Sequence, residues 1–240
     1  MLLFDHSYSS PEENLACDEA ILEACEATEI PSGVLRFWES PRYFVVLGYT
    51  GKIDIEANIA ACRGREIPIL RRCSGGGTVL QGPGCLNYSL VFPIAEGEAL
   101  SGILETNRFV MNRNARALSR VLNAPVEIQG HSDLTLEGRK FSGNAQRRKR
   151  KFFLFHGTFL LDFDLGLLKG VLPLPTLQPQ YRGQRAHGDF VINLNTDPQR
   201  VKKALREEWD AEGTLGLAPQ ARMAKLIEEK YARREWNARF

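Results

Sequence analysis

The spacing of apolar residues predicts helices near both ends of the chain and one in its middle. Residues 10–13 (Ser-Pro-Glu-Glu) are typical of a helix start, because serine caps the backbone, proline suits the first position and glutamate can return to the cap. Apolar side chains then recur at helical intervals as far as Cys25. Further helices are expected over residues 101–122, 197–212 and 219–236.

Short runs rich in β-branched and aromatic residues predict strands between these helices. Two strands split by a Ser-Pro turn are expected within residues 33–49, and others over residues 67–70 and 87–92. Residues 133–165 predict a strand, a Glu-Gly turn and two strands joined by a basic loop at residues 147–151. A proline-punctuated connection follows at residues 173–188. Because strands and helices do not alternate regularly, the pattern favours a single α+β domain over residues 1–240, with a mixed, largely antiparallel sheet flanked by helices.

Composition and charge argue against several classes of protein. The net charge of +2 is too small to argue for bulk nucleic-acid binding. The N-terminus does not resemble a signal peptide, and no apolar run approaches the ~20 residues of a membrane helix. The five cysteines have no C-x-x-C spacing, which fits a reducing compartment better than a disulfide scaffold or a zinc site. We therefore expect a cytoplasmic protein that binds neither nucleic acid nor membrane and builds no metal site from its own side chains.

A glycine-rich stretch follows the strand expected at residues 67–70. Five glycines lie within residues 75–84, and Gly75, Gly76 and Gly77 come directly after two arginines. Amides without side chains can approach a phosphate closely, and Arg71 and Arg72 carry guanidinium groups suited to phosphate or carboxylate oxygens. The stretch lacks the Gly-Lys of a P-loop and leads into a strand instead of the helix of a Rossmann motif. A glycine-rich turn with solvated arginines remains the alternative.

Two further stretches have unusual composition. Lys140 is followed by Phe-Ser-Gly-Asn-Ala, and His156, Gly157 and Thr158 interrupt an otherwise apolar run. A lone lysine is usually solvated, and a histidine in an apolar strand is more often a hydrogen-bonded core residue than a catalyst. Three such stretches in one chain nevertheless favour a common polar site at the sheet.

Together these stretches resemble the lipoate–protein ligase A family, within the biotin and lipoate A/B protein ligase superfamily. The similar segments, in family order, are ENLACDEAIL, RRCSGGGTV, GPGCLNYSL, SDLTLEGRKFSGNAQ, HGTFLLD and EKYARREWN. The combination of R-R-x-S-G-G-G with a later G-x-K-x-S-G-x-A and H-G-T is specific, unlike a solitary glycine motif. The resemblance implies a catalytic domain with a class II synthetase-like fold.

The resemblance also implies roles for individual residues. Lys140 would be catalytic and would contact the lipoyl carbonyl and the α-phosphate. Arg72 and the loop from Gly75 to Val79 would hold the adenylate, and Asp133 would support the site. The other substrate- or nucleotide-binding residues carried over by motif are Ser74, Gly76, Gly77, Thr78, Asn87, Ser142, Gly143, Ala145, His156 and Gly157.

The implied reaction is ATP-dependent activation of lipoate or octanoate to an acyl-adenylate, followed by transfer to a lysine of a lipoyl acceptor domain. Such acceptors are the 2-oxoacid dehydrogenase E2 or H-protein-like domains, and Mg²⁺ is expected with the triphosphate. The basic loop at residues 147–151 is a candidate contact with an acidic acceptor, with a solvated hairpin tip as the alternative. Many family members continue after the EWN stretch into an accessory domain. The sequence has three residues after it, so we expect no such C-terminal domain and a possible separate accessory subunit.

Departures from the family pattern leave two other functions open. Residues 81–84 (Gln-Gly-Pro-Gly) are similar to related octanoyltransferases, and residues 49–52 also differ from the expected ligase wording. A cysteine-dependent transferase would use a thioester and no ATP. Its expected nucleophile positions, within residues 129–132 and 170–180, hold no cysteine, although Cys73 and Cys85 flank the glycine loop. A non-catalytic lipoate- or adenylate-binding protein would not need Lys140.

Overall fold

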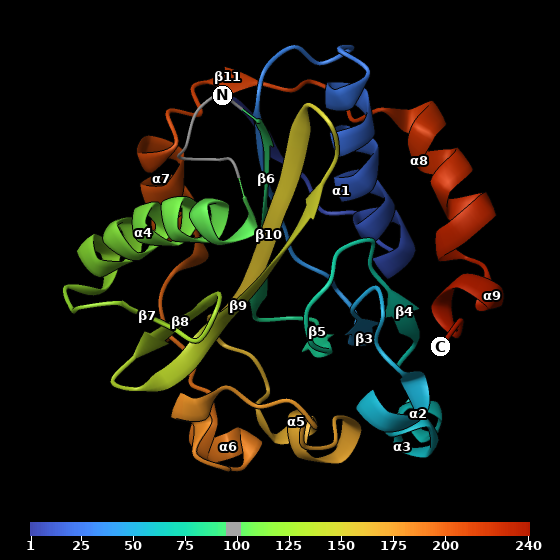
Figure 1. Cartoon of the computed structure of the whole chain (residues 1–240), viewed down its shortest axis with the longest axis vertical. Coiled ribbons are helices and arrows are strands. Elements are labelled where there is room, and N and C mark those ends of the chain that lie inside the picture. The colour runs from blue at the N-terminus through green and yellow to red at the C-terminus, as the bar shows by residue number, and fades with distance from the viewer. Residues whose placement is uncertain (95–101) are drawn as a thin grey trace.

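Two β-sheets form the centre of the protein, in a computed structural model that describes residues 1–94 and 102–240 (Figure 1). In this part of the chain an eight-stranded sheet has the order β11-β1-β2-β6-β10-β9-β8-β7, and a three-stranded sheet has the order β4-β3-β5. The large sheet comprises β1 (Leu2–Asp5), β2 (Val34–Trp38), β6 (Cys85–Pro93), β7 (Glu127–Gln129), β8 (Asp133–Leu136), β9 (Arg139–Arg148), β10 (Phe152–Leu160) and β11 (Gly213–Thr214). The small sheet comprises β3 (Phe44–Leu47), β4 (Ile69–Arg71) and β5 (Val79–Gln81).

The large sheet is mostly antiparallel, since β1 pairs in parallel with β2 and β11 and the other neighbours run antiparallel. The helices are α1 (Pro11–Glu26), α2 (Ile53–Glu56), α3 (Ile59–Gly64), α4 (Ile103–Leu122), α5 (Gly166–Val171), α6 (His187–Phe190), α7 (Pro198–Glu208), α8 (Gln220–Leu226) and α9 (Arg234–Asn237). A 3₁₀ turn, η2 (Gln180–Arg182), and a π-helical turn, η3 (Ile227–Tyr231), complete the elements. The predicted α+β fold with a largely antiparallel sheet is confirmed.

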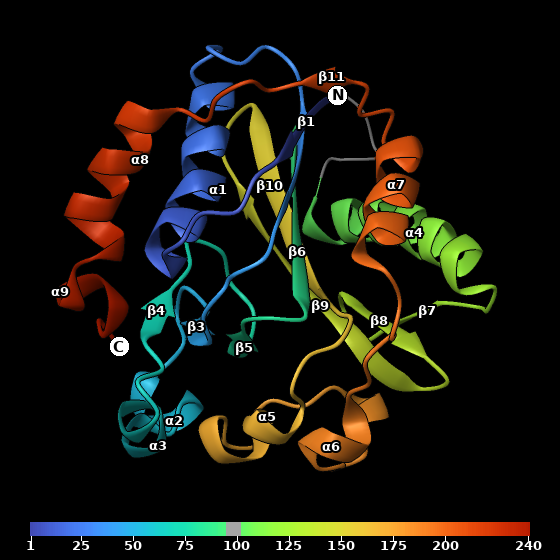
Figure 2. The same ribbon diagram turned by 180° about the vertical axis from the view of Figure 1, so that it is seen from behind.

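Helices cover both faces of the large sheet. Helices α1 and α8 lie on one side of β6 and β10, and α4 and α7 lie on the other, as the two opposite views agree (Figures 1 and 2). Strand β10 contributes Phe153 and Phe155 to the cluster under α4 and α7, and Phe152 and Leu154 to the cluster under α1 and α8. A strand buried on both faces is apolar without alternation, which explains the continuous run at residues 152–155.

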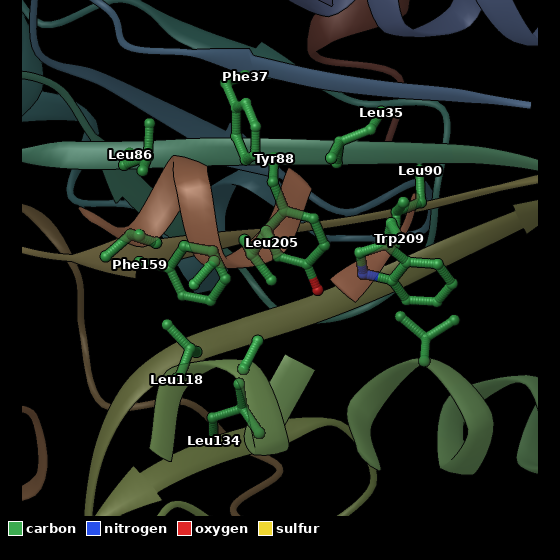
Figure 3. Close-up of a cluster of buried hydrophobic side chains, with 14 of the residues drawn as sticks. Leu35, Phe37, Leu86, Tyr88, Leu90, Leu118, Leu134, Phe159, Leu205 and Trp209 are labelled. Carbon is green, nitrogen blue, oxygen red and sulfur yellow. The ribbon is translucent and has the colours of Figure 1, made fainter. Parts of the chain in front are cut away.

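The cluster under α4 and α7 includes Tyr88 and Trp209 (Figure 3), whose polar atoms take part in a chain of hydrogen bonds through the core. Trp209 Nε1 donates to Asn114 Oδ1 (2.9 Å), and Asn114 Nδ2 donates to the hydroxyl of Tyr88 (2.8 Å). The Tyr88 hydroxyl in turn donates to Asn144 Oδ1 (2.6 Å). Because buried polar groups need partners, this chain fixes the side chain of Asn144 on β9 from the core.

Local sequence signals account for several elements. Ser10 Oγ accepts from the Glu13 amide (3.2 Å) and Glu13 Oε2 accepts from the Ser10 amide (3.1 Å), which is the expected capping box. Glu137 and Gly138 both have positive φ (52° and 70°), as a two-residue hairpin turn requires. The predicted Glu-Gly turn between β8 and β9 is therefore confirmed.

The C-terminal region differs from the expected pair of regular helices. The helix predicted over residues 197–212 ends at Glu208, and the one predicted over residues 219–236 is divided into α8, η3 and α9. In η3 the Tyr231 hydroxyl donates to Glu19 Oε2 (2.6 Å), and α9 turns toward β4. These tertiary contacts override the helical spacing.

Other elements lay outside the sequence expectations. Strands β1, β5, β7 and β11 have two to four residues, too few to show a period. Helices α5 and α6 and the turn η2 occur around the predicted proline-punctuated connection. Ser101, the expected first residue of the middle helix, lies outside the described residues. Within the described ranges, no helix combines the length and apolar character needed to cross a membrane.

Candidate functional site

The three unusual stretches meet on one face of the large sheet. Paired residues on neighbouring strands project to the same face, and residues two apart along a strand share it. Ala145, His156 and Ser89 form one cross-strand row, and Asp133, Gly143, Thr158 and Asn87 form the next. The glycine loop lies on this face, because a Cβ on Gly76 would contact Ala145 Cβ at 3.5 Å. The structure thus brings together most of the residues predicted from the motifs.

Ser142 and Gly157 are exceptions. Ser142 pairs with Phe159 and Leu134, which belong to the core under α4 and α7, so its side chain is buried on the opposite face. A Cβ on Gly157 would overlap Asn144 Oδ1, so the absent side chain leaves room for Asn144. Strand alternation directs these two positions to the core, where they support the site, and their contribution to ligand binding stays a prediction.

Lys140 lies at the edge of the polar face. Its Nζ is 2.7 Å from Asp133 Oδ1, and its side chain is 27% exposed. A Cβ on Gly143 would approach Lys140 Nζ to 2.9 Å, so the glycine lets the lysine fold back across the strand. Residues three apart would normally face opposite sides, but the register shift between Leu134 and Thr135 restores a common face. The cation therefore lies beside Gly143, two residues or roughly 7 Å along β9 from the glycine loop at Ala145.

Both arginines before the glycine loop are buried, so the solvated alternative is wrong. Arg72 Nε donates to Ser74 Oγ (3.1 Å), and its Nη2 donates to the carbonyl oxygens of Gly75 (2.6 Å) and Gly77 (2.8 Å). Burial lowers the pKa of Arg72 to about 10, which leaves it charged at neutral pH. In this structure the guanidinium shapes the loop from inside, and its contact with a nucleotide stays a prediction.

Arg71 ties the loop to the C-terminal segment. Its Nη1 donates to the carbonyl oxygens of Gly48 (2.8 Å) and Gly51 (2.7 Å). Its backbone amide donates to Asn237 Oδ1 (2.9 Å), and its carbonyl accepts from Trp236 Nε1 (2.9 Å). The EWN stretch thus supports the glycine loop from behind, a role that sequence reasoning did not assign.

Gly48 and the three glycines of the loop are needed for different structural reasons. Gly76 has φ +87°, a conformation that favours glycine, and a Cβ on Gly48 would overlap the Gly76 carbonyl oxygen. Gly75 and Gly77 have no positive φ and no protein atom within 4 Å of a Cβ. The fold therefore requires glycine at positions 48 and 76, whereas the open space at Gly75 and Gly77 leaves their amides accessible to a ligand.

Ser74 is linked through His156 to a buried ion pair. Ser74 Oγ is 2.6 Å from His156 Nε2, and His156 Nδ1 is 3.4 Å from Asp18 Oδ2. Asp18 Oδ1 pairs with Arg36 Nη1 at 2.5 Å. Burial raises the pKa of Asp18, but Arg36 and His156 outweigh it and lower the pKa overall. The sequence of contacts Ser74–His156–Asp18 resembles a nucleophile triad. Ser74, however, is only 1% exposed and its hydroxyl accepts a hydrogen bond from Arg72. These contacts therefore anchor the glycine loop to β10.

Other polar side chains of the predicted site form hydrogen bonds with one another or with neighbouring residues. Thr78 Oγ1 donates to Glu56 Oε2 (2.5 Å), which fixes the end of the loop, and Val79 begins β5. Thr158 Oγ1 donates to Asn87 Oδ1 (2.9 Å) in the floor of the site. An open cavity of about 220 Å³ beside the loop is lined by Tyr49, Thr50, Cys73, Gly75, Ile103, Gln146, Arg147 and Arg148.

Sequence reasoning missed several residues at the site. Asp18 and Arg36 could have been suspected, since Asp18 falls in the matched ENLACDEAIL stretch and Arg36 interrupts an apolar strand. Glu56 gave no distinct signal, and Asn144, although it lies in the matched SDLTLEGRKFSGNAQ stretch, was assigned no role. Their roles come from contacts with residues far away in the sequence.

The basic turn at residues 147–151 is partly anchored to α1. Lys149 Nζ pairs with Glu23 Oε1 (3.0 Å), and the Glu26 carboxylate accepts from the Lys151 amide (2.9 Å). The guanidinium of Arg147 lies over the Tyr49 ring, 5.6 Å from its centre. The turn is therefore more than a solvated hairpin tip, and its contact with an acceptor stays a prediction.

The thiols are poorly suited to nucleophilic catalysis. All five cysteines are free and buried. Burial raises the pKa of Cys73 and Cys85 to about 12, so little thiolate exists at neutral pH. Across residues 1–94 and 102–240, no three His, Cys, Asp or Glu side chains gather in a way that could hold a metal ion.

Two solved structures share this fold. The crystal structure of a lipoate-protein ligase A bound with ATP has a TM-score of 0.83 at 22% identity, covering 99% of this chain and 98% of that chain. A bi-partite lipoate protein ligase from Thermoplasma acidophilum, described with its E2 lipoyl domain, also has a TM-score of 0.83 at 22% identity, covering 99% and 95%.

The sequence itself is similar to ligases and to transferases. "Probable lipoate-protein ligase A" of Mycoplasma pneumoniae is 30% identical over 243 residues, covering 95% of this chain and 70% of the relative. "Octanoyltransferase LipM" of Geobacillus kaustophilus is 28% identical over 269 residues, covering 97% and 96%. Residues 10–209 match the family described as the lipoyl protein ligase A/B catalytic domain. Because this match covers most of the chain and the Mycoplasma relative is 30% identical over 95% of it, the chain belongs to this family.

Proposed function

We propose that this chain uses ATP to activate lipoate or octanoate as an acyl-adenylate and transfers the acyl group to a lysine of a lipoyl acceptor domain. The observation that carries the proposal is the position of Lys140, on the face of β9 that contacts the glycine loop. A partly exposed cation on the same face as open glycine amides suits the oxygens of an acyl carbonyl and a phosphate that lie between them. The ATP-bound ligase with the same fold supports ATP as the activating nucleotide.

The proposed chemistry needs no protein nucleophile. The acid's carboxylate attacks the α-phosphorus of ATP and pyrophosphate leaves. The acceptor lysine amine then attacks the acyl carbonyl and AMP leaves. Both steps depend on alignment and on stabilising negative oxygens. Lys140 would hold the carbonyl and α-phosphate oxygens, and the amides of Gly75 and Gly77 would hold the phosphate.

Mg²⁺ would enter with the triphosphate. It is usually held by one or two carboxylates together with substrate phosphates, so a site of three protein ligands is not required. Asp133, which pairs with Lys140, and Glu56, which contacts Thr78 of the glycine loop, are the candidate carboxylates. The ion would neutralise charge on the phosphates.

An acidic lipoyl domain is the proposed acceptor. The Thermoplasma ligase is described with an E2 lipoyl domain, which supports an acceptor of this kind. The exposed Arg147 and Arg150 of the basic turn would steer such a domain toward the loop, in a salt-sensitive way.

One experiment separates the candidate functions. The chain is mixed with an acceptor domain and given lipoate with Mg-ATP, preformed lipoyl-adenylate, or octanoyl acyl carrier protein without ATP. We expect ATP-dependent use of lipoate, transfer from the adenylate, and no transfer from the carrier. Transfer from the carrier without ATP would reject the ligase proposal. Adenylate binding without transfer would favour a non-catalytic binding protein, and transfer from the adenylate alone would point to a separate accessory subunit.

A cysteine-dependent transferase is the second candidate, because the LipM relative covers nearly the whole chain. The high pKa values of the buried thiols oppose it. We expect Cys73→Ala and Cys85→Ala each to keep the transfer rate within about threefold of wild type, since neither thiol supplies a thiolate. The rates are measured with preformed lipoyl-adenylate. Loss of activity in either variant, together with a thioester trapped on the wild-type chain, would contradict this expectation.

Gly75→Ala tests whether the open side of the loop faces the nucleotide. No protein atom lies within 4 Å of a Cβ at position 75, so we expect an unchanged melting temperature. Nucleotide affinity should fall at least about tenfold, because forcing a methyl group into a close contact costs ~1–3 kcal/mol. Calorimetric titration with a non-hydrolysable ATP analogue gives the affinity. Gly64→Ala, in equally open space at the end of α3, is the control: it should leave nucleotide affinity unchanged and can raise the melting temperature by a few degrees at most, because alanine favours a helix by ~0.5–1 kcal/mol over glycine.

A further inference from the structure

Residues 180–192 wrap around the hairpin that carries Lys140, and we call this segment the strap. Arg185 Nη2 donates to the carbonyl oxygen of Gly138 at the hairpin turn (3.1 Å). The Ile192 amide donates to the Lys140 carbonyl oxygen (3.0 Å), and Val191 forms a parallel bridge with Lys140. The strap is therefore attached to the backbone of the β8–β9 turn and to the start of β9.

The strap also reaches the side chains of the site through Tyr181. The Tyr181 hydroxyl donates to Asp133 Oδ2 (2.7 Å), while Asp133 Oδ1 pairs with Lys140 Nζ (2.7 Å). Burial and the neighbouring Asp133 charge raise the pKa of Tyr181, so the phenol keeps its proton and acts as a donor. One carboxylate thus joins the strap to the candidate catalytic cation.

The rest of the strap holds the Tyr181 ring in place. The ring packs on Phe190, with 5.2 Å between centres. The guanidinium groups of Arg182 and Arg185 lie over the same Phe190 ring, at 4.4 and 5.2 Å from its centre. Since these contacts do not involve the hydroxyl, the ring would keep its position without it.

We propose that Tyr181 is a positioning residue for Lys140, acting through Asp133. The inference rests on the proposed function, because it assigns Lys140 to the reacting phosphate and carbonyl. A carboxylate with one fixed oxygen cannot rotate freely, so the phenol directs Oδ1 toward the ammonium. Without the hydroxyl, Asp133 turns, and Lys140 leaves its place over Gly143.

Tyr181→Phe removes the hydroxyl and keeps the ring. We expect kcat for transfer from preformed lipoyl-adenylate to fall about tenfold, the size of effect of a hydrogen bond to a charged group. The KM for the adenylate should rise by a smaller factor than kcat falls, because the glycine loop still binds the phosphate whereas the contact with Lys140 is strongest in the transition state. Tyr181→Phe combined with Asp133→Asn should be no slower than Asp133→Asn alone, because both changes break the same connection.

A second measurement does not depend on catalysis. Labelling of Lys140 by an amine reagent, followed by mass spectrometry with the other lysines as internal references, should be several-fold faster in Tyr181→Phe. The matched control is Tyr43→Phe. The Tyr43 ring packs on Phe163, which belongs to the same hydrophobic cluster as Phe190. This variant should change neither the labelling of Lys140 nor the transfer rate.

The outcomes separate this inference from the proposed function. Wild-type labelling in Tyr181→Phe, or a wild-type rate in that variant, would overturn the positioning role. An additive double mutant would overturn the path through Asp133. The wild-type chain could also transfer nothing from the adenylate while Tyr181→Phe still alters the labelling of Lys140. That result would reject the proposed function but support the connection from Tyr181 through Asp133 to Lys140.

Discussion

Lys140→Ala is expected to slow adenylate formation and acyl transfer by at least about a hundredfold while leaving the fold intact. Removing one preorganised group that stabilises transition-state charge typically has an effect of this order. The Lys140 side chain is partly exposed, and Asp133 keeps the hydrogen bond from the Tyr181 hydroxyl (2.7 Å), so a large loss of stability is not expected. The measurements are pyrophosphate release with lipoate and Mg-ATP, transfer from preformed lipoyl-adenylate, and thermal unfolding.

The exposed Lys169 in α5 provides the matched control, since Lys169→Ala removes the same charge away from the motif. Lys140→Arg keeps the charge, but its planar guanidinium does not match a site shaped for a compact ammonium over Gly143, so we expect little rescue. Near-normal pyrophosphate release and transfer by Lys140→Ala would remove Lys140 from the mechanism.

Gly48→Ala is expected to be far more damaging to stability than Gly75→Ala. A methyl group there would overlap the Gly76 carbonyl oxygen, and both are backbone positions that cannot rotate away. Overpacking of this kind costs ~1–3 kcal/mol, and each kcal/mol lowers the melting temperature of a domain this size by roughly 2–4 °C. Because the loop must move, nucleotide binding should be lost together with stability.

Gly75→Ala is the matched comparison for the melting temperature of Gly48→Ala. Both substitutions add one methyl group beside the loop, but one meets the protein and the other meets open space. We expect a lower melting temperature only for Gly48→Ala, measured by scanning calorimetry without ligand. Equal melting temperatures for the two variants would show that the loop does not need its close approach to Gly48.

Elements with strong local signals could be predicted from the sequence. The capping box at Ser10 and the Glu137-Gly138 turn depend on residues within three positions of one another, and both are present. The division of the last helix could not be predicted, because it depends on the contact of Tyr231 with Glu19, more than 200 residues away. Strands such as β11 are too short for any period.

In the candidate site, too, local motifs could be read from the sequence, whereas features that depend on distant contacts could not. The motif spacing identified Lys140 and the glycine loop, and the structure brings His156 and Asp133 to the same polar face. Spacing alone could not reveal that a register shift turns Lys140 toward Gly143, or that alternation turns Ser142 to the core. The burial of Arg72 could not be predicted from the sequence either, because hydrogen bonds from a guanidinium to backbone carbonyl oxygens require no particular residue type at the acceptor positions.

The hydrogen bond between the Arg71 amide and Asn237 has a consequence for biosynthesis. The two residues are 166 positions apart, so the ribosome needs roughly 8–33 s to reach Asn237 after Arg71, at ~5–20 residues per second. During that interval the β4 edge lacks its final partners, and the glycine loop lacks its support. Nascent chains can therefore collapse around α1 and the large sheet well before the glycine loop gains this support. Ligand binding, monitored on stalled chains of increasing length, would appear as one late step once the Trp236-Asn237 segment has emerged.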